Sequence, residues 1–525
     1  MAPPSRPSRE RLFLLVFLAV NLVLASYYVD LWCTPNPVSR VLPVLTLLET
    51  GSFRIDKYAG RSWDEARVGD HYYSDKAPLP SVAAVPLYWL MQRTGLARTT
   101  PTTGRRFPVY IWESSGVSDG RVFVVPEWIP PLFMCGLVFG SLPFALLVFL
   151  AFVKIRGSSN AVSPVVLVMM SFYGSFMFVF AGTFFSHVLT AFLLVSAYVL
   201  LQRTRYFASG AVVGLAFMSE YPVALAIPLW ALAIWANEKR LRNVVSFALG
   251  VLPSVVLILL YNSATTGHVF TTLNAFHDKE IFRQGLSQHY GFRLPSLQSL
   301  WGLSFSAYMG LLPHVPVLLL CGHFATRDLF SARALARLPR SYLAMFAIPY
   351  FLLFSSFFTW WGGWSYGPRY LTCLAALLVY EGVAYLSTRR VHRLVFLAIT
   401  GIGVLTTWLA KITLGYMIPD HTTSLGAAPG GSVFSSYLLP QLARGHFNAN
   451  NLATLGFGVT PGVAALLWLV AFALAVIGLS VWHTRVYGAA ANGQSVPRGR
   501  AKLRREGEPA ETVQMGQRRR RARIP

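Results

Sequence analysis

Charged residues are scarce in this chain, and their scarcity excludes an ordinary soluble protein. Only 13% of the 525 residues are Asp, Glu, Lys or Arg, whereas 54% are apolar; a typical soluble protein is about 25% charged. Apolar runs of about 17–25 residues, the length that crosses a bilayer, recur along the whole sequence. Because helices satisfy their own backbone in lipid, the composition predicts an all-α polytopic membrane protein.

Cysteines, repeats and phosphate-binding loops are also missing or few. The four cysteines stand singly, so neither a disulfide framework nor a cysteine metal motif is visible. No internal repeat is evident, which disfavours a transporter built from inverted repeats. No Gly-rich phosphate loop is present either, which disfavours a nucleotide as substrate.

Acidic residues are outnumbered, 21 against 45 basic, giving a net charge of +24. The tail at 485–525 carries eleven of the basic residues and three Glu, and we expect a disordered cytoplasmic segment resting on anionic lipid. Others gather in short loops between apolar runs, as the positive-inside rule expects on the cytoplasmic side. The charge therefore predicts membrane lipids as partners, and no nucleic acid.

Placing the basic loops inside predicts about twelve crossings, with both termini cytoplasmic and a membrane domain at residues 1–484. The first crossing is interpreted as a retained signal anchor, since no small-residue cleavage site follows it. The largest outward loop, 29–128, holds two short apolar stretches, Pro37 to Leu48 and Leu79 to Met91. Both are predicted to be helices on the membrane surface. The predicted crossings are 11–28, 129–153, 161–184, 186–202, 207–219, 221–236, 244–262, 303–322, 341–359, 370–388, 394–414 and 456–482.

Ten of the 21 acidic residues lie between Asp30 and Glu127, in this outward loop. A chain this apolar that gathers its carboxylates in one loop is predicted to carry its chemistry there. A carboxylate within hydrogen-bond reach can take the proton from an incoming hydroxyl. Asp56 is the first choice for this base, with Asp30 and Asp64 as alternatives. The plain alternative is that most of these acids are simply solvated.

Lys76 lies directly before a predicted helix start, within the stretch Tyr72 to Pro80. A lysine offers a point charge and three hydrogen-bond donors, and a helix start adds a partial positive charge. This combination suits a phosphate. Tyr73 and Asp75 are predicted to position the substrate beside it. The alternative is a turn whose charged groups face water.

His187 and Glu220 stand at the rims of apolar segments, where ionisable groups are costly and suggest function. Both fall on the outward side of the twelve-crossing scheme, and with Tyr221 they are predicted to position the sugar or the base. A His–Glu pair that only ties helices together is the structural alternative. A divalent metal held by the two with loop carboxylates is another; no other cofactor is indicated.

Aromatic rings and glycines alternate in the stretch Thr359 to Tyr370. Flat rings and close backbone approach suit a sugar or a lipid, and Arg369 can clamp a phosphate through two parallel hydrogen bonds. Trp361, Trp364 and Tyr366 are the candidate contacts. An ordinary aromatic belt at the membrane interface is the alternative.

In this order, the motifs resemble the GT-C superfamily of membrane glycosyltransferases. The likeness is greatest to bacterial members related to protein O-mannosyltransferases and lipid A aminoarabinose transferases (glycosyltransferase family 39-like), and it covers most of residues 10 to 370. It rests on a first helix, a large outward loop with a surface helix, and a Tyr-x-x-x-Lys-x-Pro element at Tyr72 to Pro78. A polar helix start, a helix break and the string Trp360 to Tyr370 complete it.

The resemblance implies a GT-C fold and transfer of a sugar from a polyprenyl-phosphate donor to a lipid, glycan or protein acceptor. The active site would face the periplasm, on the outer side of a bacterial inner membrane. Lys76 would bind the lipid phosphate and a loop carboxylate would be the base. The chain departs from the family pattern at Thr34 to Pro37, which lacks the usual acid, and at Ser186-His187, where aminoarabinose transferases carry Asp. A lipid or lipid-linked sugar flippase, and a polymerase or ligase of lipid-linked glycans, are the competing functions.

Overall fold

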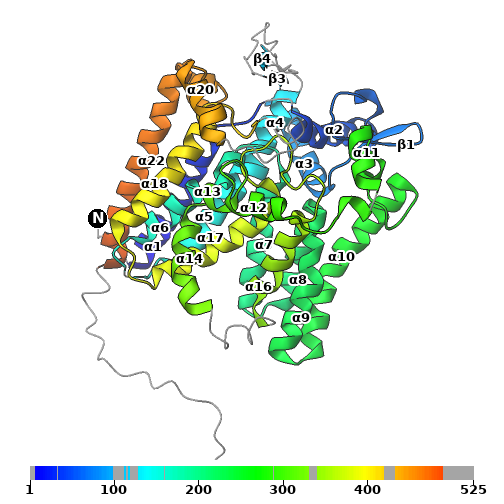
Figure 1. Cartoon of the computed structure of the whole chain (residues 1–525). Coiled ribbons are helices and arrows are strands. Elements are labelled where there is room, and N and C mark those ends of the chain that lie inside the picture. Colours follow the sequence, from blue (N-terminus) through cyan, green and yellow to red (C-terminus); the bar gives the residue numbers. More distant parts are fainter. Residues whose placement is uncertain are drawn as a thin grey trace, which may run out of the picture.

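The computed structural model describes residues 6–31, 34–97, 111–113, 116–118, 128–158, 160–287, 289–329, 340–418 and 432–488. Over these ranges the chain is mainly helical, and elements of the first outward loop lie together at one end of the helix bundle (Figure 1). Most of the predicted tail, residues 489–525, lies outside the described ranges, as does Glu127.

Helices or helical pieces fall in each predicted crossing. By length and composition, five described segments could cross a membrane: Ile129–Ile155, Leu241–Thr266, Arg369–Ser387, Arg393–Ile412 and Pro461–Tyr487. The number of crossings stays a prediction. The helices of the bundle are α1 (Arg6–Ser26), α4 (Ile129–Cys135), η3 (Gly136–Ser141), α5 (Leu142–Ile155), α6 (Pro164–Tyr173), η4 (Phe176–Phe180), α7 (Ser186–Gln202), α8 (Tyr206–Ser219), η5 (Tyr221–Leu225), α9 (Ala226–Glu238), α10 (Leu241–Thr266), α14 (Val317–Leu329), α16 (Tyr342–Ser355), η9 (Arg369–Leu371), α17 (Thr372–Ser387), α18 (Arg393–Ile412), α22 (Pro461–His483) and η11 (Thr484–Gly488).

The first outward loop contains both predicted surface helices, and it also contains strands that an all-α prediction omits. Two short antiparallel hairpins are present. The elements of this loop are α2 (Pro35–Thr50), η1 (Asp56–Tyr58), β1 (Glu65–Val68), β2 (His71–Ser74), α3 (Leu79–Arg93), β3 (Ile111–Glu113) and β4 (Gly116–Ser118). The other described elements are η6 (Leu273–Phe276), α11 (Glu280–Ser287), η7 (His289–Gly291), α12 (Leu297–Phe305), α13 (Leu311–His314), η10 (Phe434–Leu438), α20 (Leu439–Ala443) and α21 (Leu452–Phe457).

The α2 helix is enclosed more fully than a helix resting on a surface would be. It follows Thr34, has Pro35 in its first turn and ends at Gly51, whose φ of 68° suits a residue without Cβ. Residues 37–46 are all buried. Its polar side chains Ser39, Arg40 and Thr46 are therefore buried in the protein, where they need partners.

The α8 and α10 helices approach closely because glycines face one another. A Cβ on Gly210 would lie 2.0 Å from the carbonyl oxygen of Phe247. A Cβ on Gly250 would lie 2.1 Å from that of Phe207. Small residues are what allow helix backbones to meet at this distance in membrane proteins.

We expect Gly250→Ala to destabilise the bundle by about 1–3 kcal/mol, because its methyl group would overlap backbone that cannot move freely. Gly478 in α22 is the matched control, since nothing lies within 4 Å of its Cβ position. Gly478→Ala should leave stability unchanged or raise it by less than about 1 kcal/mol. Thermal unfolding of both variants in detergent tests this, and equal melting temperatures would contradict the close approach.

Candidate functional site

The β1–β2 hairpin brings Asp64 and Asp75 together. In its register Glu65 pairs with Ser74, so the residues just outside that pair, Asp64 and Asp75, meet at the open end of the hairpin. Lys76 follows directly. Its Nζ lies 2.9 Å from Asp64 Oδ2 and 3.0 Å from Asp75 Oδ2. One ammonium therefore contacts two carboxylates just before α3.

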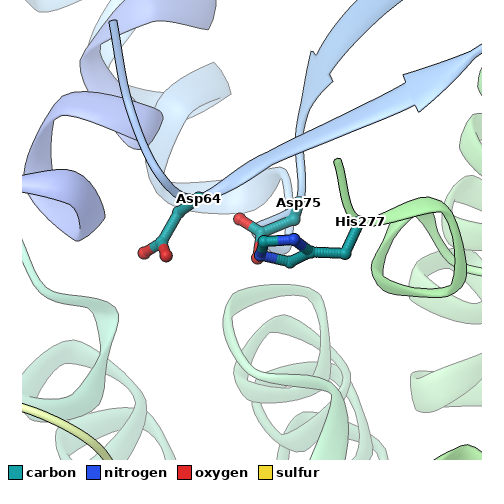
Figure 2. A group of neighbouring side chains, drawn as sticks. All are labelled: Asp64, Asp75 and His277. Atoms are coloured by element: carbon teal, nitrogen blue, oxygen red, sulfur yellow. The ribbon is translucent and has the colours of Figure 1, made fainter. Parts of the chain in front are cut away.

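A distant segment adds His277 to this group. Ala66 of β1 forms an antiparallel bridge with His277, and the Asp278 N–H donates to the Glu65 carbonyl at 2.8 Å. The bridge places His277 Nε2 3.9 Å from Asp75 Oδ2. Figure 2 shows the ring against the Asp75 carboxyl, with Asp64 beside them. Asp64, Asp75, Lys76 and His277 are called the Lys76 centre below.

Among the described residues, Asp64, Asp75 and His277 are the group that could hold a metal, since their ligand atoms lie within 4.8 Å of one another. In this arrangement, however, the Lys76 ammonium already contacts both carboxylates. His277 Nδ1 accepts from the Lys279 N–H at 3.1 Å, so the neutral ring carries its proton on Nε2. A metal would require Lys76 to withdraw and the ring to change tautomer. The arrangement therefore fits an ammonium better than a metal ion.

Charge coupling keeps the Asp64–Lys76 pair ionised. Burial alone would raise the pKa of Asp64, but the Lys76 ammonium, helped by Arg369 and His277, holds it below its usual value. Burial alone would lower the pKa of Lys76, but Asp64 and Asp75 raise it. Burial lowers the pKa of His277, against the opposing effect of Asp75. At neutral pH the pair is charged and His277 is neutral.

The two pKa shifts predict how stability depends on pH. The lowered pKa of Asp64 stabilises the fold above the unfolded value of about 3.9, and this contribution is lost as pH falls through the folded pKa. The raised pKa of Lys76 stabilises the fold below about 10.4, and this is lost as pH rises through its folded pKa. We expect Asp64→Asn to cost about 1–3 kcal/mol between about pH 5 and pH 9.

The cost of Asp64→Asn should shrink below about pH 4, where the wild-type carboxyl also becomes neutral. Melting temperatures measured from acid to neutral pH test this. Asp70→Asn is the control, because that side chain is fully exposed. A cost that stays constant into acid would show that Asp64 is not held charged by Lys76.

A second cluster forms around Glu220, where the backbone is extended between α8 and η5. Its Oε1 accepts from Arg40 Nη2 at 3.4 Å, from the Ser186 hydroxyl, and from His187 Nδ1 at 3.2 Å. Arg40 is only 2% exposed. Arg40, Ser186, His187 and Glu220 are called the Glu220 centre below. It joins α2, the start of α7 and the end of α8.

Consecutive residues of α2 connect the two centres. The Ser39 hydroxyl donates to the Asp64 carbonyl at 2.5 Å and lies 2.7 Å from the Ser74 hydroxyl. Its neighbour Arg40 reaches Glu220, and its charge is also felt by Asp64 and Asp75. Because α2 is buried and anchored at both places, the centres are held in one arrangement.

Both centres, and Tyr221 and Arg369 near them, contain buried polar atoms that have no hydrogen-bond partner within the described residues. Each such atom costs about 1–3 kcal/mol unless a ligand or water meets it. Some are hydrogen-bond donors and some are acceptors, so a ligand with both kinds of group would satisfy them. The atoms are Arg40 Nη1, Asp75 Oδ1, His187 Nε2, Tyr221 OH and Arg369 Nε.

Arg369 and His187 of the Glu220 centre lie near the same two aromatic rings, those of Phe185 and Tyr370. Its guanidinium lies 5.7 Å from the Phe185 centroid and 5.3 Å from that of Tyr370. The His187 ring is 5.7 Å from Phe185 and 6.3 Å from Tyr370. At Gly362, φ is 82° and a Cβ would meet Arg369 Cγ at 3.2 Å. The glycine lets the chain fold back over the arginine.

The candidate bases lie in three different places. Asp56 is 41% exposed and accepts from His71 Nδ1 at 2.8 Å and the Tyr72 N–H at 2.6 Å. Burial would raise its pKa, but these two contacts hold it lower. Asp30 is buried beside Lys411 and Tyr416. Of the three, Asp64 belongs to the Lys76 centre, and which one is the base stays a prediction.

The other residues predicted to contact the substrate are four aromatic side chains, and they differ in how deeply they are buried. Tyr73 packs in a small apolar cluster with Ala66 and Leu273. Tyr366 is fully buried against His314, with ring centroids 5.0 Å apart. Trp361 lies against Trp360, and Trp364 is 37% exposed.

Two residues of the site were not found from the sequence. Arg40 is a lone arginine within an apolar stretch that becomes a buried helix, and this isolation was its signal. His277 reaches the site through a strand bridge to β1. The turn Gly69-Asp70 between alternating residues could have indicated the hairpin, but nothing local indicates its bridge to His277.

The chain matches no protein-family model and no curated protein. Its structure is similar to the crystal structure of ArnT from Cupriavidus metallidurans bound to undecaprenyl phosphate. The two are 14% identical, with a TM-score of 0.42, and the match covers 92% of this chain and 78% of that one. A likeness this loose gives no residue correspondence, so the roles proposed below rest on contacts within this chain.

Proposed function

We propose that the chain is a membrane glycosyltransferase that moves a sugar from a polyprenyl-phosphate donor to an acceptor hydroxyl. One observation carries the proposal: Lys76 Nζ is held 2.9 and 3.0 Å from two carboxylates before the first turn of α3. Arg40 and Arg369 each add a buried N–H without a partner among the described residues. Largely buried cations with spare hydrogen-bond donors suit a phosphate.

The lipid phosphate would take the place of one carboxylate on Lys76. When the bond between the sugar C1 and the phosphate oxygen breaks, its electron pair leaves with the phosphate. Lys76 and Arg369 would neutralise that developing charge, so the leaving group needs little help from an acid. The aromatic faces around Arg369 would contact the sugar.

An apolar surface beside Lys76 suits the lipid part of the sugar donor. The α3 helix begins three residues after Lys76 and exposes Val82, Trp89 and Leu90 to its surroundings. A polyprenyl chain could lie along these side chains while its phosphate reaches the buried centre. The sugar donor would then arrive laterally from the bilayer.

The proposed location is the outer face of a bacterial inner membrane, with a lipid, glycan or protein as the acceptor. The positive-inside rule, which places the basic loops in the cytoplasm, supports it. With that orientation both centres face the periplasm, because α2 and the hairpin belong to the first outward loop.

The test uses the purified full-length chain in liposomes, given undecaprenyl phosphate carrying different radiolabelled sugars. We expect label to move to lipid, glycan or protein acceptors from at least one lipid donor, and from no nucleotide sugar. A parallel reaction with a chelator asks whether a metal is needed. If no lipid donor reacts while the labelled lipid crosses the bilayer, the chain is a flippase and the proposal is wrong.

A further inference from the structure

We infer that His187, oriented by Glu220, is the base that takes the proton from the acceptor hydroxyl. The inference rests on the proposed function, and it concerns the acceptor, whereas the Lys76 centre concerns the sugar donor. Such a transfer needs one group to receive the hydroxyl proton as the oxygen attacks the sugar.

The contact with Glu220 fixes the tautomer of His187. Glu220 Oε1 lies 3.2 Å from His187 Nδ1. An ionised carboxylate only accepts hydrogen bonds, so Nδ1 carries the proton of the neutral ring and Nε2 holds the lone pair. The aspartate of a Ser-His-Asp triad orients its histidine in the same way, and it stabilises the imidazolium that forms.

The other ring nitrogen is placed as a base would be. His187 Nε2 is buried and has no partner within the described part of the chain. Aromatic rings surround the imidazole, with centroids at 6.2 Å for Phe180, 5.7 Å for Phe185 and 6.3 Å for Tyr370. A His187–Glu220 pair that only linked two helices would use Nδ1 and would give Nε2 no role. An acceptor hydroxyl would supply the hydrogen bond that Nε2 lacks.

The carboxylates of the first loop are less suitable. Asp56 is paired with His71, and Asp64 is paired with Lys76. Asp30 is close enough for its charge to interact with that of Lys411. Asp75 is the strongest rival, because its Oδ1 is buried without a partner. Its other oxygen, however, contacts Lys76 at 3.0 Å, so this carboxylate is already held by the cation that the lipid phosphate needs. An imidazole, with a reference pKa of about 6.5, also suits proton transfer near neutral pH better than a carboxylate.

The step balances without a further reactant. The acceptor oxygen forms its bond to the sugar C1 as the bond from C1 to the phosphate oxygen breaks. The electron pair leaves with the polyprenyl phosphate, and the hydroxyl proton moves to His187 Nε2. Glu220 stabilises the resulting imidazolium against the nearby cations Arg40 and Arg369, and the proton is later released to water.

The experiment compares His187→Gln and Asp75→Asn with the wild type, measuring the turnover of transfer and the binding of undecaprenyl phosphate. We expect His187→Gln to lower kcat by about 10²–10⁴-fold while the Kd for the lipid changes by less than about threefold. Added imidazole should restore part of the activity of His187→Gly. His71→Gln, which alters an exposed histidine–carboxylate pair, is the matched control and should keep full activity.

Near-normal kcat in His187→Gln overturns the inference. So does a loss of lipid binding and thermal stability together, which would make the pair structural. A larger loss in Asp75→Asn than in His187→Gln assigns the base to Asp75 instead. If the wild type transfers no sugar, the proposed function itself fails, and that outcome is seen before any variant is compared.

Discussion

Replacing Lys76 with alanine is expected to lower sugar transfer by about 10²–10³-fold, the loss typical of removing one group that stabilises a developing anion. It should also weaken the binding of undecaprenyl phosphate, because the phosphate loses its central cation. Lys76→Arg should keep part of the transfer activity and part of the lipid binding, because the positive charge remains. Both should still fall, because the planar guanidinium is larger than the ammonium that lies 2.9 and 3.0 Å from the two carboxylates. Transfer rates and lipid binding in liposomes measure these effects.

Lys57→Ala is the matched control for Lys76→Ala. Lys57 belongs to the same loop and also contacts a carboxylate, Glu49, at 3.0 Å, but its side chain is exposed. Its replacement should change transfer less than about threefold, since an exposed pair contributes little. Normal transfer by Lys76→Ala would show that Lys76 does not bind the phosphate.

The assay of Lys76→Ala needs a chelator as well. Without the ammonium, Asp64 and Asp75 stand together beside His277, and their ligand atoms are within 4.8 Å of one another. A divalent ion could then bind in place of the lysine and restore positive charge. Activity of the variant that disappears with the chelator would show such a replacement, and the wild type should be unaffected by the same treatment.

Local sequence patterns were sufficient for the parts of the site that depend on neighbouring residues. Lys76 was found because helix starts and proline positions are local. The stretches at Pro37 to Leu48 and Leu79 to Met91 are helices, now α2 and α3. The contact between His187 and Glu220, weighed as a helix-tying pair, is present at 3.2 Å. Their outward-side placement, inferred from charge in the loops, stays a prediction.

The contacts that the sequence did not show depend on register and burial. Asp56 was the first choice of base because it lies beside the first surface helix, and its role stays a prediction. A strand pairing of Glu65 with Ser74 sets Asp64 against Asp75 and leaves Asp56 with His71. A shift of one residue in that register would send these side chains to the opposite face. The Gly69-Asp70 turn is the local signal for this hairpin, but no pattern within the loop specifies the bridge that brings His277.

Arg40 was missed for a different reason. Apolar spacing predicted a helix on a surface, where an arginine is ordinary. In the structure residues 37–46 of this helix are covered, so the same arginine becomes a buried cation that must be paired. The packing of α3 and the β1–β2 hairpin against α2 is what buries this arginine. That packing involves residues far from Arg40 along the chain.

Breaking the Arg40–Glu220 pair is expected to have the largest effect on stability. The side chain of Arg40 is 2% exposed and that of Glu220 is 21% exposed. Arg40→Met leaves the Glu220 carboxylate with only Ser186 and His187. Removing one partner of a buried ion pair typically costs about 3–5 kcal/mol. The melting temperature in detergent should fall accordingly. Arg54→Met, at an exposed position of the same loop, should leave it unchanged.

A double variant measures how much Arg40 and Glu220 stabilise one another. Glu220→Gln leaves Arg40 as an unpaired buried cation, so it should also destabilise the fold. In Arg40→Met/Glu220→Gln neither charge is left alone, and the loss should be smaller than the sum of the two single losses by at least about 1 kcal/mol. Strict additivity would mean that the two side chains, though 3.4 Å apart, do not stabilise one another. Glu220 would then be held in place by Ser186 and His187, and the connection between the two centres would depend on Ser39 alone.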